Sequence, residues 1–249
     1  MGSGRSGGGM NEPGGKGQPS GMMSERNQSD APGVVYAEFS LTGVLRFLSH
    51  QEVLTLFARA ILRARLPVAF SRGFNPHPKV SLPLPRSVGM SCSGDLVRME
   101  WAEAVAGEVD VSGPLQQHLP EGITLHRVWR TRSRAFPQAS AVEWEIDLAG
   151  LDRRGLEEKA ARLRGAPTFP LLRRSVKGGG EVEIDVRRFV ADLRVAEDVL
   201  WVRTVIGPDG SLRPGELLEA LDLPVKAGLG RISRTEIEWK NKDSFDPAV

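Results

Sequence analysis

The order of strand-like and helix-like segments constrains the fold of this 249-residue chain more than any other sequence feature. An apolar run, VVYAEFSL (34–41), precedes a stretch over 50–65 with apolar residues at helical spacing, and Ser49 and Glu52 form a capping box at its start. Two strand patterns, a short helix pattern and a last strand pattern follow: VSLPLP, GDLVRMEWA (94–102), VSGPLQQHL and ITLHRVWRT (123–131). The order β-α-β-β-α-β predicts an antiparallel sheet with both helices on one face.

The same order returns in the second half of the chain. AVEWEIDLAG (141–150) alternates like a strand, Asp152 can cap the helix RRGLEEKAARLRG, and Pro214 suits the first turn of another helix. The other segments predict an added hairpin with a GGG tip and three more strands: FPLLRRSVK, EVEIDV, VADLRVA, VLWVRTVI and LGRISRTEIEWK. We therefore predict an α+β protein of two tandem ferredoxin-like sandwiches with antiparallel sheets, at 34–134 and 140–240.

Both ends of the chain are expected to lie outside these two domains. Residues 1–33 are glycine-rich and polar and cannot bury enough apolar surface to fold, which predicts a disordered N-terminal tail. The polar stretch 241–249 is predicted to be a frayed C-terminal tail. Four methionines are possible translation starts: Met1, Met10, Met22 and Met23.

Composition argues against several classes of protein. No apolar run approaches the ~18 residues of a membrane-spanning helix, and the N-terminus lacks the apolar segment of a signal peptide, so we expect a cytoplasmic protein without a membrane partner. The single cysteine, Cys92, excludes an intrachain disulfide and a cysteine-bound iron–sulfur cluster. We expect no cofactor and no metal site.

The segment SRGFNPHPK (71–79) stands out as a loop that could hold a ligand. Pro76 and Pro78 prevent it from forming a helix or an interior strand, and they fix His77 between them. His50 opens the first helix, where free N–H groups and the helix dipole favour an anion. If the loop folds back over the helix start, six side chains could converge on one anion: Arg46, His50, Arg72, Asn75, His77 and Lys79. The alternative is that His50 only caps the helix and His77 is an exposed loop residue.

Basic residues are concentrated around the same loop, although the net charge of the chain is only +2. They are Arg59, Arg63, Arg65, Arg72, Lys79 and Arg86. Such a group is either a solvated face or an anion-binding surface, and the sequence leaves both interpretations open. His118 and His126 lie in predicted secondary structure, where a structural role is expected.

The stretch RFLSHQEVLTLFARAILRARLPVAFSRGFNPHPKVSLPLPRSVG resembles the signature of the radical-SAM-linked, or radical-SAM-associated, bacterial proteins, a family of uncharacterised function. Members of that family resemble the C-terminal domain of some radical SAM proteins that carry a cobalamin-binding domain. The resemblance is dense from 34 to 89 and returns at ISRTEIEW, whereas Arg72 departs from the glutamine common in the family. It implies a radical SAM enzyme as partner, but this chain lacks the cysteines to be such an enzyme itself.

Three functions are compatible with these features. The first is an accessory protein that recognises a substrate, with RNA as a candidate because of the basic span and the sheet architecture. The second is a structural partner that docks onto a radical SAM protein without a ligand of its own. The third is an enzyme in which His50 and His77 act as acid and base on an anionic substrate.

Overall fold

The computed structural model describes residues 33–102, 109–174 and 180–246. Residues 1–32 of the predicted N-terminal tail, the end of the C-terminal tail and most of the GGG tip lie outside the described residues. The helices are α1 (His50–Arg63), α2 (Ser112–Gln117), α3 (Arg153–Gly165), α4 (Pro214–Ala220) and α5 (Val225–Gly228), with 3₁₀ turns at Gly43–Phe47, Val186–Arg188, Leu229–Arg231 and Lys242–Ser244. The strands are β1 (Val34–Leu41), β2 (Val80–Ser81), β3 (Ser91–Glu100), β4 (Ile123–Thr131), β5 (Ala139–Asp147), β6 (Pro170–Arg174), β7 (Glu181–Asp185), β8 (Val190–Ala196), β9 (Val199–Gly207), β10 (Gly210–Ser211) and β11 (Ile232–Trp239).

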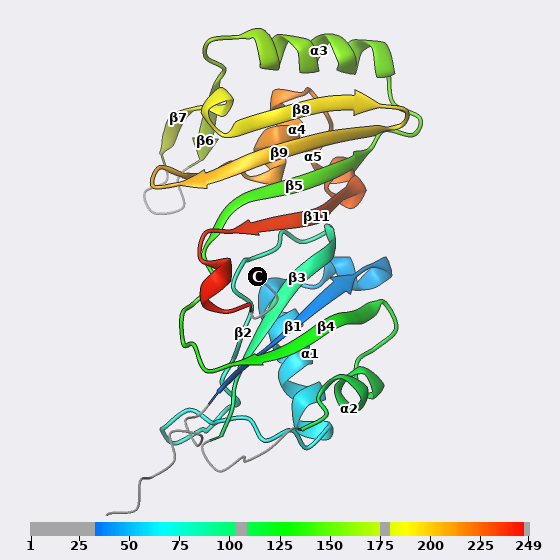
Figure 1. The fold of residues 1–249 in the computed structure, drawn as a ribbon. Coiled ribbons are helices and arrows are strands. Elements are labelled where there is room, and N and C mark those ends of the chain that lie inside the picture. Colours follow the sequence, from blue (N-terminus) through cyan, green and yellow to red (C-terminus); the bar gives the residue numbers. More distant parts are fainter. Residues whose placement is uncertain (1–32, 103–108, 175–179, 247–249) are drawn as a thin grey trace, which may run out of the picture.

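A single nine-stranded sheet runs through both halves of the molecule (Figure 1). Its order is β10-β9-β5-β11-β3-β1-β4, with β2 also paired to β3 and β8 also paired to β9. Neighbouring strands are antiparallel except β11 and β3, which are parallel and join the halves. The architecture is therefore mixed α+β and is dominated by one large, mostly antiparallel sheet.

The join between the halves is possible because β2 is very short. Its two residues pair with Met99 and Arg98 near the end of β3. The beginning of β3 is left open on that side, and Ser233 and Arg234 of β11 pair there with Ser91 and Cys92. Prolines on both sides of VSL keep β2 short, because proline has no backbone N–H to donate to a hydrogen bond between strands.

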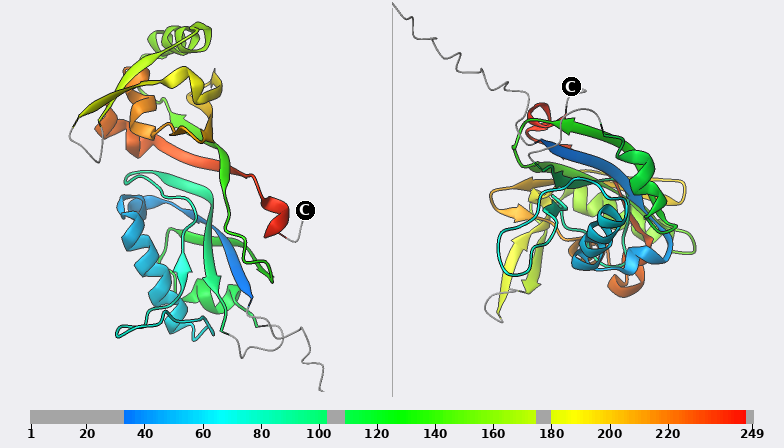
Figure 2. Two further views of the ribbon diagram at one scale, coloured as in Figure 1. Left: turned by 90° about the vertical axis from the view of Figure 1, so that its left-hand side faces the viewer. Right: turned by 90° about the horizontal axis from the view of Figure 1, so that it is seen from below.

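Helices α1 and α2 cover one face of the sheet in the first half, which Figure 2 shows from the side and from below. The predicted capping box of α1 is confirmed: Ser49 Oγ accepts from Glu52 N, and Ser49 N donates to the Glu52 carboxylate at 2.7 Å. The apolar stripe of α1 packs under inward-facing side chains of β1 and β3, and the buried helix residues are Val53, Phe57, Ala60 and Ile61.

The second half is built in the same way around α3 and α4. The Asp152 side chain accepts from Gly155 N, as predicted, and Leu156, Ala160 and Leu163 of α3 are buried. Pro214 begins α4, whose leucines join the same core. The pairing of β6 with β7 confirms the predicted hairpin, which forms a separate two-stranded sheet.

The end of the chain differs from the frayed tail expected at 241–249. Phe245 is buried against the face of the sheet opposite α1, where it contacts Tyr36 at 5.2 Å between ring centroids. Trp129 Nε1 donates to the Phe245 carbonyl at 2.8 Å, and Arg127 pairs with Asp246 at 2.5 Å. One aromatic side chain thus fixes an otherwise polar segment, since burying a phenylalanine is worth roughly 1.5–3 kcal/mol.

Candidate functional site

The six residues predicted to bind one anion lie at two separate places in the first half. His50 opens α1 beside the start of β3, because the preceding strand β1 ends opposite Cys92. Loop 71–79 lies at the far end of β3, where Ala69 N donates to the Glu100 carbonyl at 2.7 Å. Helix α1 runs between these two ends (Figure 1). Its 14 residues make it about 21 Å long at 1.5 Å per residue. The hypothesis that the loop folds back over the helix start is therefore wrong, and His50 and His77 do not form an acid–base pair.

Loop 71–79 is a hairpin held by its own hydrogen bonds. Ser71 N donates to the His77 carbonyl at 2.9 Å, and His77 N donates to Ser71 Oγ at 3.1 Å. The His77 ring is engaged inside the loop as well, since its Nδ1 lies 2.9 Å from Ser71 Oγ and 3.4 Å from the Asn75 carbonyl. Two of the predicted ligand-binding residues, Asn75 and His77, therefore shape the loop.

The base of the loop is fixed to the sheet by an ion-pair cluster. Lys79 Nζ lies 3.0 Å from the Glu100 carboxylate, and Arg98 Nη1 contacts the other oxygen of that carboxylate at 3.0 Å. Burial tends to raise the pKa of Glu100, but the hydrogen bonds from Lys79 and Arg98 outweigh it and leave that pKa lowered. Lys79 is therefore partly neutralised, whereas Arg72 has no ion pair or hydrogen bond within the described part of the chain.

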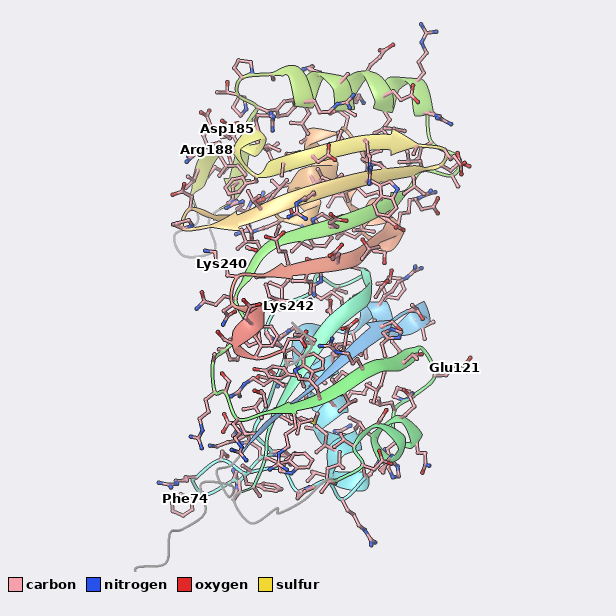
Figure 3. The ribbon with its side chains drawn as sticks, viewed as in Figure 1. Phe74, Glu121, Asp185, Arg188, Lys240 and Lys242 are labelled. Carbon is pink, nitrogen blue, oxygen red and sulfur yellow. The ribbon has the colours of Figure 1, made fainter. Side chains whose placement is uncertain are left out.

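The tip of the loop carries a fully exposed aromatic side chain. Phe74 has a relative exposure of 108%, and Figure 3 shows its ring pointing away from the rest of the protein. Gly73 has φ +139°, a conformation that other residues rarely adopt, so the glycine allows the turn that presents Phe74. The sequence pattern marked Phe74 only as a part of the motif. Its full exposure in a hydrogen-bonded loop is what makes it a candidate contact residue.

Arg86, at the end of the motif, has a structural role that sequence reasoning missed. Its buried guanidinium donates to four carbonyl oxygens, those of Arg46, Leu48, Ser87 and Met90. Burial lowers the pKa of Arg86, and the four carbonyl acceptors compensate for the buried charge. The side chain thereby ties the loop after β2 to the segment that leads into α1.

The two halves meet at a buried ion pair. Arg234 of β11, which is 2% exposed, donates to Asp95 of β3 through Nε at 2.8 Å and through Nη2 at 2.5 Å. Arg234 Nη1 also donates to the Pro85 carbonyl at 2.9 Å, and Arg46 Nη1 donates across the junction to the Gly230 carbonyl at 2.9 Å. Arg46 therefore holds the halves together instead of facing a ligand.

The groups near this junction are poorly suited to catalysis. Burial, followed by the charges of Arg234 and Arg86, lowers the pKa of His50, while Asp95 opposes the shift. Burial and Asp95 raise the pKa of the Cys92 thiol far above its usual range, so that thiol is not a nucleophile. Within the described residues there is no group of three or more His, Cys, Asp or Glu side chains that could hold a metal ion.

A small cavity of about 240 Å³ also lies at the junction, between the segment after β2 and the second half. It is lined by Leu84, Pro85, Ser87, Val142, Trp144, Thr204, Ile206, Ser211, Leu212, Arg213, Pro214 and Arg234. Its best-placed polar groups are already used: Trp144 Nε1 donates to Thr204 Oγ1 at 2.9 Å, and Arg234 is paired with Asp95. We therefore regard the exposed loop as the stronger candidate site.

Comparison with known proteins assigns the chain to a family by sequence alone. A family of uncharacterised proteins conserved in bacteria, DUF2344, matches residues 35–214, which include loop 71–79 and Asp95 but not its partner Arg234. The curated proteins contain no match to this chain. None of the helices in the described ranges has the length and apolar character needed to cross a bilayer.

Proposed function

The chain belongs to this bacterial family, DUF2344, and for it we propose a role as a non-catalytic RNA-recognition protein that works beside a radical SAM enzyme in the cytoplasm. The partner enzyme is inferred from the resemblance of residues 34–89 to the radical-SAM-linked signature. The ligand class is inferred from one observation, the fully exposed Phe74 on a loop that holds itself rigid.

A rigid, exposed ring suits the recognition of unpaired bases. Stacking of a base on an aromatic side chain contributes about 1–3 kcal/mol and is tolerant of sequence. The internal hydrogen bonds of the loop lower the entropy cost of binding, because the loop is already ordered before contact. Arg72 lies two residues from Phe74 and is free to contact a phosphate or to stack on a second base.

The architecture favours loop 71–79, and not the open face of the sheet, as the surface that recognises RNA. The strand orders β4-β1-β3-β2 and β11-β5-β9-β8 are the same in the two halves, which supports a pair of ferredoxin-like units. Four-stranded sheets of RNA-binding domains often stack bases on aromatic residues of their open face. Here Phe245 covers Tyr36 on that face, and Tyr36 is fully buried. Phe74 is the exposed aromatic residue of the first half that is best placed to stack on a base.

RNA binding is tested by fluorescence anisotropy of the full chain with a labelled 20-nucleotide oligouridylate at low salt. We expect Phe74→Ala to weaken binding about 5- to 150-fold, which corresponds to the loss of ~1–3 kcal/mol of stacking. The matched control is Phe47→Ala, because Phe47 is also exposed (56%) but lies near the start of α1. Unchanged affinity in Phe74→Ala, or no binding by the wild type at low salt, contradicts the proposal.

A second role, docking onto the radical SAM protein, is favoured by an apolar patch near the start of α1. Val44, Phe47 and Val88 are exposed there on adjoining segments, since Gly89 N donates to the Arg46 carbonyl at 2.7 Å. The two roles separate in one co-purification experiment with the enzyme from the native host. Phe47→Ala should reduce recovery of the enzyme and leave RNA affinity intact, whereas Phe74→Ala should do the reverse.

A further inference from the structure

A basic groove between α1 and α2 lies outside the site described so far. It has a volume of about 670 Å³ and is lined by Leu48, Gln51, Glu52, Thr55, Leu56, Arg59, Arg63, Gln117, His118, Leu119 and Pro120. Leu56, Leu119 and Pro120 give it apolar surface, and the glutamines and Thr55 supply neutral hydrogen-bonding groups. The groove is therefore amphipathic, with its charge concentrated on the α1 wall.

Arg59 and Arg63 provide that charge. They stand four residues apart on α1, so their side chains project from the same face of the helix, one turn apart. Both are exposed, and neither makes an ion pair or hydrogen bond among the residues that the structure describes. Two arginines at the start of α3 differ, since Arg153 and Arg154 each pair with a glutamate one turn further on, at 2.9 Å and 3.6 Å.

The single carboxylate that lines the groove does not neutralise these arginines. Glu52 is engaged in the capping box, where it accepts from Ser49 N at 2.7 Å, and this hydrogen bond lowers the pKa of Glu52. The opposite wall carries the exposed imidazole of His118 at the end of α2. Two free guanidinium groups thus line an open groove in which Glu52 is the one carboxylate among the described lining residues.

We propose that this groove holds the sugar–phosphate backbone of single-stranded RNA, with Arg59 and Arg63 each contacting a phosphate. The inference rests on the proposed RNA-binding function and extends it to a second surface. Free guanidinium groups bind phosphate through paired hydrogen bonds, and the apolar side chains can pack against riboses or bases. Arg63 ends α1 at the same end of β3 as loop 71–79, and we therefore place both surfaces along one RNA strand.

The salt dependence of RNA binding separates phosphate contacts from stacking. Each phosphate contact with a single strand adds about 0.7 to the slope of log K against log salt. The variant Arg59→Gln/Arg63→Gln should therefore lower that slope by about 1.4 and weaken binding at low salt by at least about tenfold. Phe74→Ala should weaken binding with the slope unchanged, because its ring carries no charge.

The experiment uses the full chain, the labelled 20-nucleotide oligouridylate, and NaCl from low to physiological concentration. Arg153→Gln/Arg154→Gln removes the same charge from exposed positions on α3 and should keep the wild-type slope. Equal melting temperatures of the variants show that each is folded. A wild-type slope in Arg59→Gln/Arg63→Gln overturns the groove assignment while the Phe74 site stands. Absence of RNA binding by the wild type overturns both.

Discussion

His50 is held in a setting that disfavours its charged form. Burial lowers its pKa, and the neighbouring Arg234 and Arg86 act in the same direction, while Asp95 partly opposes them. The imidazole opens α1, where the positive end of the helix dipole adds a further unfavourable interaction with a proton. His50 is therefore neutral in the folded protein near neutral pH, and protonation should favour the unfolded chain.

This setting predicts a pH dependence of stability. The pKa of His50 is lower in the folded state than the ordinary value of 6.5, so below that pH the unfolded state binds more protons. The contribution of the neutral His50 side chain to the free energy of unfolding is fully present above about pH 6.5. It is lost as the pH falls through the pKa that His50 has in the folded state. Urea unfolding at pH 7.5 and at pH 5.5 should show a smaller loss of stability for His50→Gln than for the wild type. An equal loss of stability between pH 7.5 and pH 5.5 in both proteins contradicts a lowered pKa of His50 in the folded state.

Single residues also show where prediction from sequence stops. Pro76 and Pro78 correctly indicated a stiff, non-helical loop, because proline restricts the backbone locally. These prolines did not indicate at which end of the sheet the loop lies. Its position at the far end of β3 depends on Ala69 and Lys79 pairing with Glu100, a contact between residues more than twenty positions apart.

Among the elements, α1 depends on the cap that begins it. Ser49 Oγ accepts from Glu52 N at 3.3 Å, which satisfies one of the free N–H groups at the helix start. We expect Ser49→Ala to lower the free energy of unfolding by about 1 kcal/mol. The measurement is urea unfolding followed by circular dichroism, with Ser93→Ala as control because Ser93 lies exposed on β3. An equal effect of the two substitutions is evidence against the cap.

The elements that could be predicted are those whose signals are local. Helical periodicity and caps predicted α1 and α3 to within two residues at either end. The strand predicted at 123–131 coincides with β4, and the alternating run 141–150 overlaps β5, whose ends differ by two and three residues. The buried end of the chain could not be predicted in this way. Phe245 is one aromatic residue in a polar stretch, and its burial depends on a distant surface formed by Tyr36 and Trp129.

At the scale of the whole molecule, one long-range pairing turns two expected sheets into one. Arg234 pairs with Cys92 in register and its guanidinium binds Asp95, although these residues are about 140 positions apart. An arginine on an alternating strand normally indicates a solvent-facing position, so nothing in the pattern of LGRISRTEIEWK indicates a buried charge. The ion pair at the junction therefore had no local signal by which it could be identified.

That buried pair leads to the strongest stability prediction for the whole molecule. Asp95→Leu leaves the buried Arg234 without its carboxylate, which should cost about 3–5 kcal/mol. Replacing both partners, Asp95→Leu with Arg234→Met, should cost less than the sum of the two single changes, with a coupling of at least about 1 kcal/mol. Urea unfolding of the four proteins measures this coupling.

The matched control is the exposed pair Arg188 and Asp209, whose side chains are each 66% exposed at a separation of 2.8 Å. Substituting Arg188→Met, Asp209→Ala and both together should change stability by less than about 1 kcal/mol, because exposed pairs are screened by water and salt. One outcome is that the effects of the two substitutions at the buried pair simply add, as those at the exposed pair are expected to do. In that case the surrounding apolar contacts and the β11–β3 hydrogen bonds are what mainly hold the halves together. A large coupling energy at the buried pair, and not at the exposed one, means that the Arg234–Asp95 ion pair specifically stabilises the junction between the two halves. Charges that remain in water cannot supply a comparable energy.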